Sequence, residues 1–153
     1  MDMLIRLFTL PTSPSRPLPD GITLRKPIGP EHDLLIAWIA EPFGPGWASE
    51  ARVALANRPM SAYIALRDQD LLGFCCYDAT ARGFVGPIGV AEEARGTGIG
   101  AALLLACLHD MRTMGYGYAI AGAVGAPEFF RRVAGATEIE GSTPGIYRGM
   151  LRP

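Results

Sequence analysis

The sequence lacks an excess of charge of either sign. Its 14 Lys and Arg residues are balanced by 15 Asp and Glu residues, which leaves a formal net charge of −1. Proteins that hold nucleic acid by neutralising phosphates need a clear surplus of basic side chains. The composition therefore predicts no nucleic-acid partner.

Signals for a membrane or for export are also lacking. No stretch reaches the roughly 18 consecutive apolar residues that a membrane-spanning helix needs. The apolar start, Met1–Phe8, is interrupted by Arg6 and has no small-residue cleavage site after it, so it does not resemble a secretory signal. We expect no membrane partner and a cytoplasmic location.

Cysteines are few, and their spacing excludes both a disulfide framework and a zinc site. The three residues Cys75, Cys76 and Cys107 lie in apolar sequence, without a Cys-x-x-Cys pair or a neighbouring pair of histidines. Disulfide frameworks and zinc sites need such spaced ligands. The pattern predicts three buried free thiols in a reducing compartment and no metal site.

Glycine and proline, in contrast, are plentiful, with 19 and 13 residues in a chain of 153. This length suits one domain. Residues 3–10 read as a strand and Pro11–Pro19 as a Pro-rich linker, so we divide the chain into an N-terminal strand with its linker (1–19) and a single domain (20–153). The strand is expected to pack at a sheet edge or on a partner chain, and such edge pairing would give a homodimer.

Hydrophobic periodicity predicts a mixed α/β (α+β) architecture. Helices are expected over residues 31–40, 47–57, 98–114 and 127–133. Strands are expected over residues 21–26, 61–67, 71–78, 83–90, 118–124, 137–139 and 146–151. Hairpin-linked strands followed by a strand–helix–strand crossover indicate a mixed sheet with helices on both faces. Because a proline cannot sit in a sheet interior, Gly86 and Pro87 predict that the strand 83–90 bends away from a neighbour.

The stretch Arg95–Ala101 carries the clearest chemistry. Its three alternate glycines let the backbone curl so that successive N–H groups converge at the start of the long helix, which favours an anion such as a pyrophosphate. The stretch also fits the loose dinucleotide pattern GxGxxG/A. That pattern requires a carboxylate about 20 residues further on, and Val124 and Gly125 occupy this place. A Walker loop is excluded because no Lys-Ser/Thr follows the glycines.

From about Gly21 to the C-terminus, the chain resembles the GNAT superfamily of N-acetyltransferases. The first hallmark of that family, Q/R-x-x-G-x-G/A at the start of the central helix, appears as Arg95–Gly100. A second, an aromatic pair shortly before a glycine, appears within Phe129–Ala136. The resemblance implies a GNAT-like fold, with a mixed sheet splayed at its fourth core strand and helices on both faces.

The resemblance further implies acetyl-CoA as cosubstrate. Backbone groups of the bent strand would pair with the pantetheine, the glycine loop would hold the pyrophosphate, and an aromatic residue of the later helix would line the site. The implied cofactor-binding residues are Ile88, Gly89, Val90, Arg95, Gly96, Thr97, Gly98, Ile99, Gly100, Ala101 and Phe130.

Acetyl transfer to an amine calls for a base and is helped by an acid. Many family members place a tyrosine acid in the helix that here holds Phe129 and Phe130, and neither phenylalanine can donate a proton. Two other tyrosines, Tyr118 and Tyr147, are alternative acids. For the base, Asp78 is the first choice because it ends the strand before the bent one, and Glu50 is the second.

Together these features predict an acyltransferase that acetylates a primary amine of a small molecule by direct attack in a ternary complex. No cysteine is near the glycine loop in sequence, so no acetyl-enzyme is expected. The alternative is a non-catalytic acyl-CoA-binding or sensing module on the same fold, which the absence of a tyrosine at Phe130 would suit.

Overall fold

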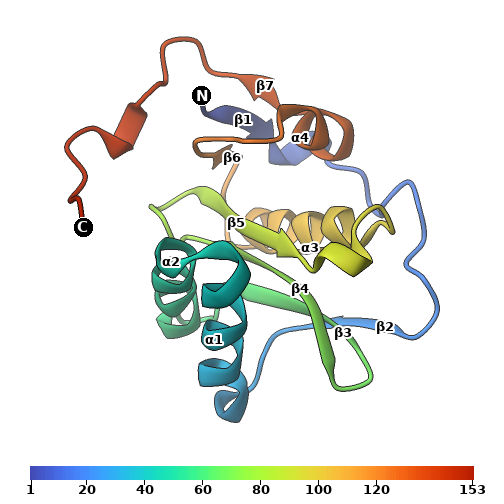
Figure 1. Ribbon diagram of the computed structural model, residues 1–153. Helices are drawn as coiled ribbons and strands as arrows, with labels where there is room; N and C mark the ends of the chain where they lie inside the picture. The colour runs from blue at the N-terminus through green and yellow to red at the C-terminus, as the bar shows by residue number, and fades with distance from the viewer.

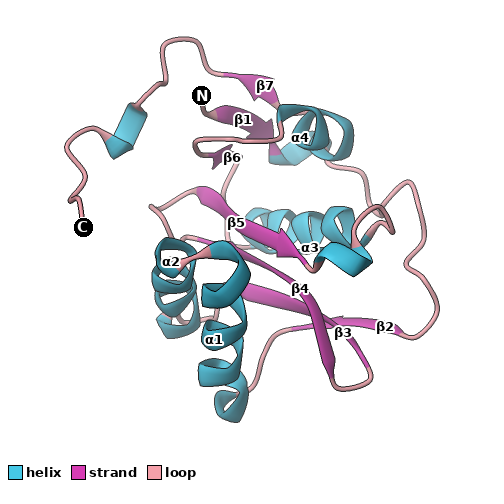
Figure 2. Ribbon diagram, in the orientation of Figure 1, coloured by secondary structure: helices cyan, strands magenta, loops and turns pink.

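A computed structural model describes residues 1–153 and contains one seven-stranded mixed sheet (Figures 1 and 2). Its order is β2-β3-β4-β5-β6-β1-β7. Only β5 and β6 run parallel, and every other pair of neighbours is antiparallel. The strands are β1 (Met3–Arg6), β2 (Ile22–Arg25), β3 (Ala62–Arg67), β4 (Asp70–Tyr77), β5 (Phe84–Val90), β6 (Tyr118–Ala121) and β7 (Thr137–Glu138).

Helices cover both faces of this sheet, as expected. They are α1 (His32–Phe43), α2 (Pro45–Ala56), α3 (Ile99–Thr113) and α4 (Pro127–Ala134). In β4, Cys75 and Tyr77 belong to the core that includes α3, whereas Phe74 and Cys76 belong to the core beneath α1 and α2. Successive side chains of a strand point to opposite faces, so a central strand that is buried on both faces has no polar side.

The central strand β5 parts from β6 along most of its length. The two pair only at Phe84–Ile120 and Val85–Ala121, while β5 stays paired with β4 as far as Val90. The parting begins at Gly86, whose φ of 120° lies where side chains are rarely tolerated. The expected bend at Gly86 and Pro87 is therefore confirmed. The parallel connection from β5 to β6 runs through α3, whose first turn starts beside this opening (Figure 1).

The N-terminal strand lies inside the sheet, so its expected place at an edge or on a partner chain is wrong. β1 pairs with β6 over Met3–Arg6 and with β7 over Met3 and Leu4. Met3 and Ile5 are fully buried in the α3 core. The strand is also shorter than expected, because residues Leu7–Thr9 form a 3-10 turn.

The C-terminal segment is irregular, and the strand expected over residues 146–151 is wrong. A single 3-10 turn spans Gly145–Tyr147 there, and the segment forms an arm beside the opening between β5 and β6 (Figure 1). Asp2 fastens this arm: its amide N–H donates to Ser142 Oγ at 2.8 Å, and its carbonyl oxygen accepts from Ile139 N–H at 2.9 Å. None of the helices combines the length and the apolar character needed to cross a bilayer.

Candidate functional site

A cleft of about 1290 Å³ opens where β5 and β6 separate. Val85–Val90 line one wall, and the start of α3 closes one end. The loop after β6, residues 122–126, lines it together with α4, and α2 and the C-terminal arm reach its other end. The linker that follows β1 also contributes residues. The cleft thus lies at the carboxyl end of the parallel pair, the usual place for ligands in open α/β sheets.

At the α3 end, six consecutive backbone amides have no partner. None of the N–H groups from Gly96 through Ala101 donates a hydrogen bond to another atom of the protein. Gly96 and Gly98 adopt φ values of 75° and 92°, and these left-handed residues turn the loop into α3. A row of free amides at the positive end of a 15-residue helix forms a concavity suited to an anion. The phosphate cradle expected from the sequence therefore has the required backbone.

Two guanidinium groups flank the cradle. Arg95 Nε donates to the carbonyl oxygen of Val90 at 3.1 Å. From the Pro-rich linker, Arg16 Nη1 donates to the carbonyl oxygen of Gly96 at 2.7 Å, and the Arg16 side chain lies over Gly98. Both arginines are exposed and line the cleft, with most of their N–H donors free. Sequence reasoning missed Arg16, because no local pattern links a linker residue to a loop 80 positions away.

The open side of β5 presents backbone groups to the cleft. Ala91 N–H donates to the carbonyl oxygen of Leu72 in β4 at 2.8 Å, and Gly89 lies opposite Phe74 in the same strand pair. Because antiparallel strands direct alternate residues to opposite sides, Ile88 and Val90 direct their backbone groups away from β4. An extended ligand could pair with them as an added strand.

Two phenylalanines of α4 close the cleft above the cradle. Phe130, which the family resemblance implied as a cofactor-binding residue, is buried and lines the cleft. Phe129 also lines it and lies against Gly100, where a Cβ would be 3.6 Å from the ring. The two rings meet edge to face at 5.2 Å. Neither ring can transfer a proton, so the two phenylalanines supply apolar contact only.

At the opposite end, Glu50 and Tyr147 line the cleft together with Thr80. Thr80 Oγ1 donates to Glu50 Oε1 at 2.5 Å, which fixes the carboxylate. The Tyr147 hydroxyl is held over the loop after β6, since a Cβ on Gly122 would be 3.0 Å from it. Burial, followed by the nearby carboxylates of Glu50 and Asp2, raises the pKa of Tyr147 above its ordinary value. Tyr147 is therefore protonated at neutral pH and able to donate.

The other two candidate catalytic residues lie outside the cleft. The Asp78 carboxylate is buried and occupied: it accepts from Gly83 N–H at 2.7 Å and from the Tyr116 hydroxyl at 2.8 Å. Asp78 has a φ of 50°, so its side chain stabilises the turn between β4 and β5 instead of meeting a ligand. Tyr118 is about half exposed and packs edge to face on Phe8.

An aromatic wall stands beside Glu50. The rings of Phe43 and Trp47 are stacked at 5.1 Å, and both line the cleft. Phe74 supports them from below, at 5.8 Å from Phe43 and 6.2 Å from Trp47. Gly89 makes this packing possible, because a Cβ there would be 2.7 Å from Phe43.

The three cysteines are free, fully buried and absent from the cleft. Burial raises the pKa of the Cys76 and Cys107 thiols, so both stay protonated and poorly nucleophilic. No group of three or more His, Cys, Asp or Glu side chains lies in an arrangement that could hold a metal ion.

Comparison with known proteins identifies similar chains. The model of the acetyltransferase (GNAT) family matches residues 32–135. Among solved structures, a GCN5-related N-acetyltransferase from Sphaerobacter thermophilus is 26% identical with a TM-score of 0.71, over 89% of this chain and 47% of that one. One from Kribbella flavida is 20% identical with a TM-score of 0.57, over 89% of this chain and 52% of that one. No curated protein matches the chain.

A further structural match is the glucosamine N-acetyltransferase region of a fungal multi-domain GH3 β-N-acetylglucosaminidase. It is 17% identical with a TM-score of 0.64, over 87% of this chain and 19% of that one. At this identity the likeness concerns the fold. The chain spans about half or less of the length of these solved structures.

Proposed function

Since this chain belongs to the GNAT acetyltransferase family, we propose that it is an N-acetyltransferase that moves an acetyl group from acetyl-CoA to a primary amine of a small molecule. The family uses acetyl-CoA in general. The single observation that carries the proposal is the row of six unpartnered amides, Gly96–Ala101, beside the open side of β5.

The residues present fit acetyl-CoA as a cosubstrate. The cradle amides and the guanidinium groups of Arg16 and Arg95 supply donors for a diphosphate. Ile88 and Val90 supply main-chain groups for the amide-bearing pantetheine arm, and Phe129 and Phe130 supply apolar contact. The remaining cradle residues, Thr97 and Ile99, contribute through their backbone, because Thr97 Oγ1 already donates to the carbonyl oxygen of Ala94 at 2.5 Å.

Glu50 is the proposed base. A primary amine is mostly an ammonium at neutral pH, and only its neutral form attacks. The Glu50 carboxylate accepts that proton directly or through a water, while the Thr80 hydroxyl holds it in place. The amine nitrogen then attacks the thioester carbonyl carbon, so that a C–N bond forms and the C–S bond breaks. The nitrogen releases its second proton to water, and Glu50 later releases the first in the same way.

Tyr147 is the proposed acid. The leaving sulfur gains the proton of the Tyr147 hydroxyl, and the tyrosine recovers a proton from solvent. Its raised pKa keeps this proton in place at neutral pH. The acid thus comes from the C-terminal arm and not from α4, where the family pattern would have placed it.

We propose direct attack within a ternary complex. An acetyl-enzyme formed on a thiol would need a cysteine in the cleft, and every cysteine is buried elsewhere. The only acidic side chain that lines the cleft is Glu50, which serves as the base in this account.

A thiol-release assay tests the proposal. The protein is incubated with acetyl-CoA and a panel of primary amines, and free CoA is detected with a thiol reagent. We expect release that depends on the amine and yields the N-acetylated product by mass. Tight binding of acetyl-CoA without release for any amine would contradict catalysis and favour the acyl-CoA-binding module instead.

A further inference from the structure

Charge is unevenly distributed along the cleft. Four charged side chains line it: Arg16, Glu50, Arg95 and Arg132. Arg16 and Arg95 contact the cradle loop, and Arg132 lies over the ring of Phe129, which itself packs on Gly100. All three positive charges therefore surround the cradle.

Glu50 is alone at the other end. It is bonded to Thr80 next to the start of β5, whereas Arg95 is bonded to Val90 at the end of β5. The strand has 7 residues, which at a rise of about 3.3 Å per residue separates the two ends by roughly 20 Å. A charge at one end is thus screened from the other.

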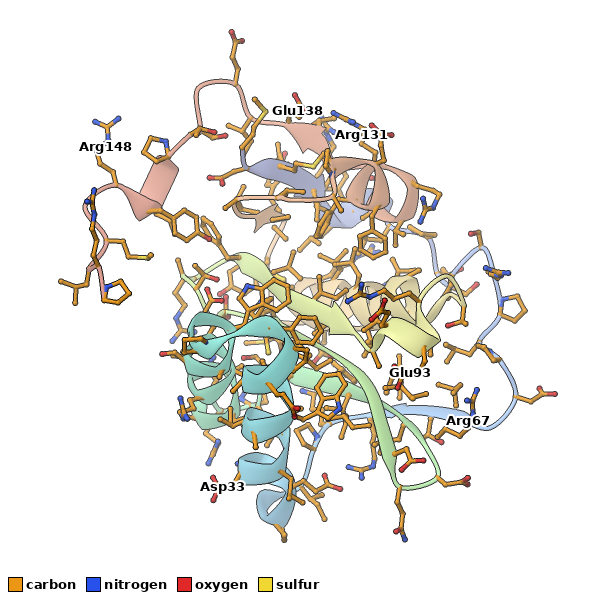
Figure 3. The ribbon with its side chains drawn as sticks, viewed as in Figure 1. Asp33, Arg67, Glu93, Arg131, Glu138 and Arg148 are labelled. Atoms are coloured by element: carbon orange, nitrogen blue, oxygen red, sulfur yellow. The ribbon has the colours of Figure 1, made fainter.

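No cation offsets Glu50 at its own end. The other residues that line the cleft near Glu50 are uncharged: Gly46, Trp47, Ser49, Thr80, Tyr147 and Met150. Phe43, also uncharged, stacks on Trp47 and reaches along the cleft to Gly89 near the end of β5. Arg148 follows Tyr147 in sequence but projects from the outer side of the arm into solvent (Figure 3). A ligand at this end therefore meets one carboxylate, the three hydroxyls of Ser49, Thr80 and Tyr147, and an aromatic and aliphatic wall.

We infer that the acceptor is a monoamine with an apolar, preferably aromatic body and no anionic group. This inference rests on the proposed acetyl transfer and narrows its substrate class. The ammonium pairs with Glu50, and the body packs on the stacked rings of Phe43 and Trp47.

The same chemistry disfavours two other classes of amine. An amino acid would bring its carboxylate to within a few ångströms of Glu50 with no cation to pair with, which is repulsive in a partly desolvated cleft. A polyamine or aminosugar would bring several polar or charged groups, and the wall offers them few partners. Discrimination among amines thus depends on the absence of a cation near Glu50 as much as on the rings of Phe43 and Trp47.

Three matched acceptors test the inference: 2-phenylethylamine, phenylalanine and phenylalaninamide. They share the same aromatic body, and the amide controls for the size of the carboxylate without its charge. We expect kcat/KM for 2-phenylethylamine to exceed that for phenylalanine at least about 10-fold, with the amide close to 2-phenylethylamine. Equal values for 2-phenylethylamine and phenylalanine, or a preference for phenylalanine, would overturn the inference.

Substitution of Glu50 tests whether this carboxylate causes the preference for 2-phenylethylamine. Glu50→Gln should shrink the ratio between 2-phenylethylamine and phenylalanine towards 1, whereas Glu41→Gln, on the exposed end of α1, should leave it unchanged. An unchanged ratio in Glu50→Gln contradicts the role of this carboxylate.

A binding experiment separates this inference from the proposed catalysis. Trp38 lies outside the cleft, so Trp38→Phe leaves Trp47 as the sole indole reporter. With the protein saturated by CoA, 2-phenylethylamine should quench Trp47 fluorescence at lower concentration than phenylalanine does. Selective quenching without turnover would refute the transferase and retain the acceptor site, and turnover without selectivity would refute the acceptor class alone.

Discussion

At the scale of single residues, the two tyrosines that the sequence offered as acids differ in position. Tyr147 lines the cleft near Glu50, and Tyr118 is exposed beside Phe8. We expect Tyr147→Phe to lower kcat about 100-fold, the usual worth of an acid, and Tyr118→Phe to change it little. Steady-state kinetics of both variants checks this. Similar losses, or none in Tyr147→Phe, would exclude Tyr147 as the acid.

The pH dependence of kcat is a second test of Tyr147 as the acid. Because burial raises its pKa above the ordinary value of about 10, the acid keeps its proton across the neutral and mildly alkaline range. The wild-type kcat should therefore show no fall from this group below about pH 10. A fall near pH 8 that disappears in Tyr147→Phe would contradict the assignment, because it would give Tyr147 a lowered pKa.

A second prediction at the scale of single residues concerns the contribution of Arg16 to CoA binding. Its guanidinium donates to the cradle loop and has free donors for a diphosphate. Arg16→Ala should weaken CoA binding about 10-fold, the loss of one charge-assisted hydrogen bond, and Arg16→Lys should weaken it less. Arg67→Ala, at an exposed residue of β3 that does not line the cleft, is the matched control. Calorimetry that gives Arg16→Ala the affinity of the wild type would contradict this role.

Sequence reasoning found both carboxylates and ranked Asp78 ahead of Glu50 as the base. Asp78 ends a strand next to the bent one, and that position suited either a base or a turn residue. The structure places it in the turn because Gly83 N–H and the Tyr116 hydroxyl occupy its carboxylate. Tyr116 is 38 positions away, so no local pattern could have indicated this contact.

At the scale of elements, the glycine loop was predictable because its chemistry is local. The preceding strand β5, the loop of alternate glycines and the following apolar helix α3 are consecutive in the sequence. Each formed as expected. The place of β1 and the irregular C-terminal arm were not predictable. Both depend on contacts between the two ends of the chain, such as the pairing of Met3 with Glu138 and the hydrogen bond from Asp2 N–H to Ser142 Oγ.

Substitution of Gly98 tests whether the conformation of the glycine loop matters for stability and CoA binding. Its φ of 92° is costly for any residue with a side chain, so Gly98→Ala should lower stability by about 1–2 kcal/mol and weaken CoA binding more than Tm alone would explain. Gly117→Ala is the control, since a Cβ there meets nothing within 4 Å and φ is not positive. Thermal melts with and without CoA check both. Equal behaviour of the two variants would contradict a special role for Gly98.

At the scale of the whole molecule, the two ends of the chain complete one sheet. β1 lies between β6 and β7, and Asp2 holds the C-terminal arm that carries Tyr147. Ile5 is fully buried, so Ile5→Ala should destabilise the protein by about 2–5 kcal/mol. Phe8→Ala, with the side chain about half exposed, should cost less than about 1 kcal/mol. Chemical denaturation that gives Ile5→Ala the cost of Phe8→Ala would mean that β1 is a dispensable tail.

The account as a whole depends on the cleft binding CoA through its diphosphate. Calorimetric titration with CoA and with pantetheine, which lacks the phosphates, measures this directly. If two cradle hydrogen bonds contribute about 1.5 kcal/mol each, CoA should bind at least about 100-fold more tightly than pantetheine. Equal affinity for the two compounds would contradict the phosphate cradle at Gly96–Ala101, and with it the account's central claim.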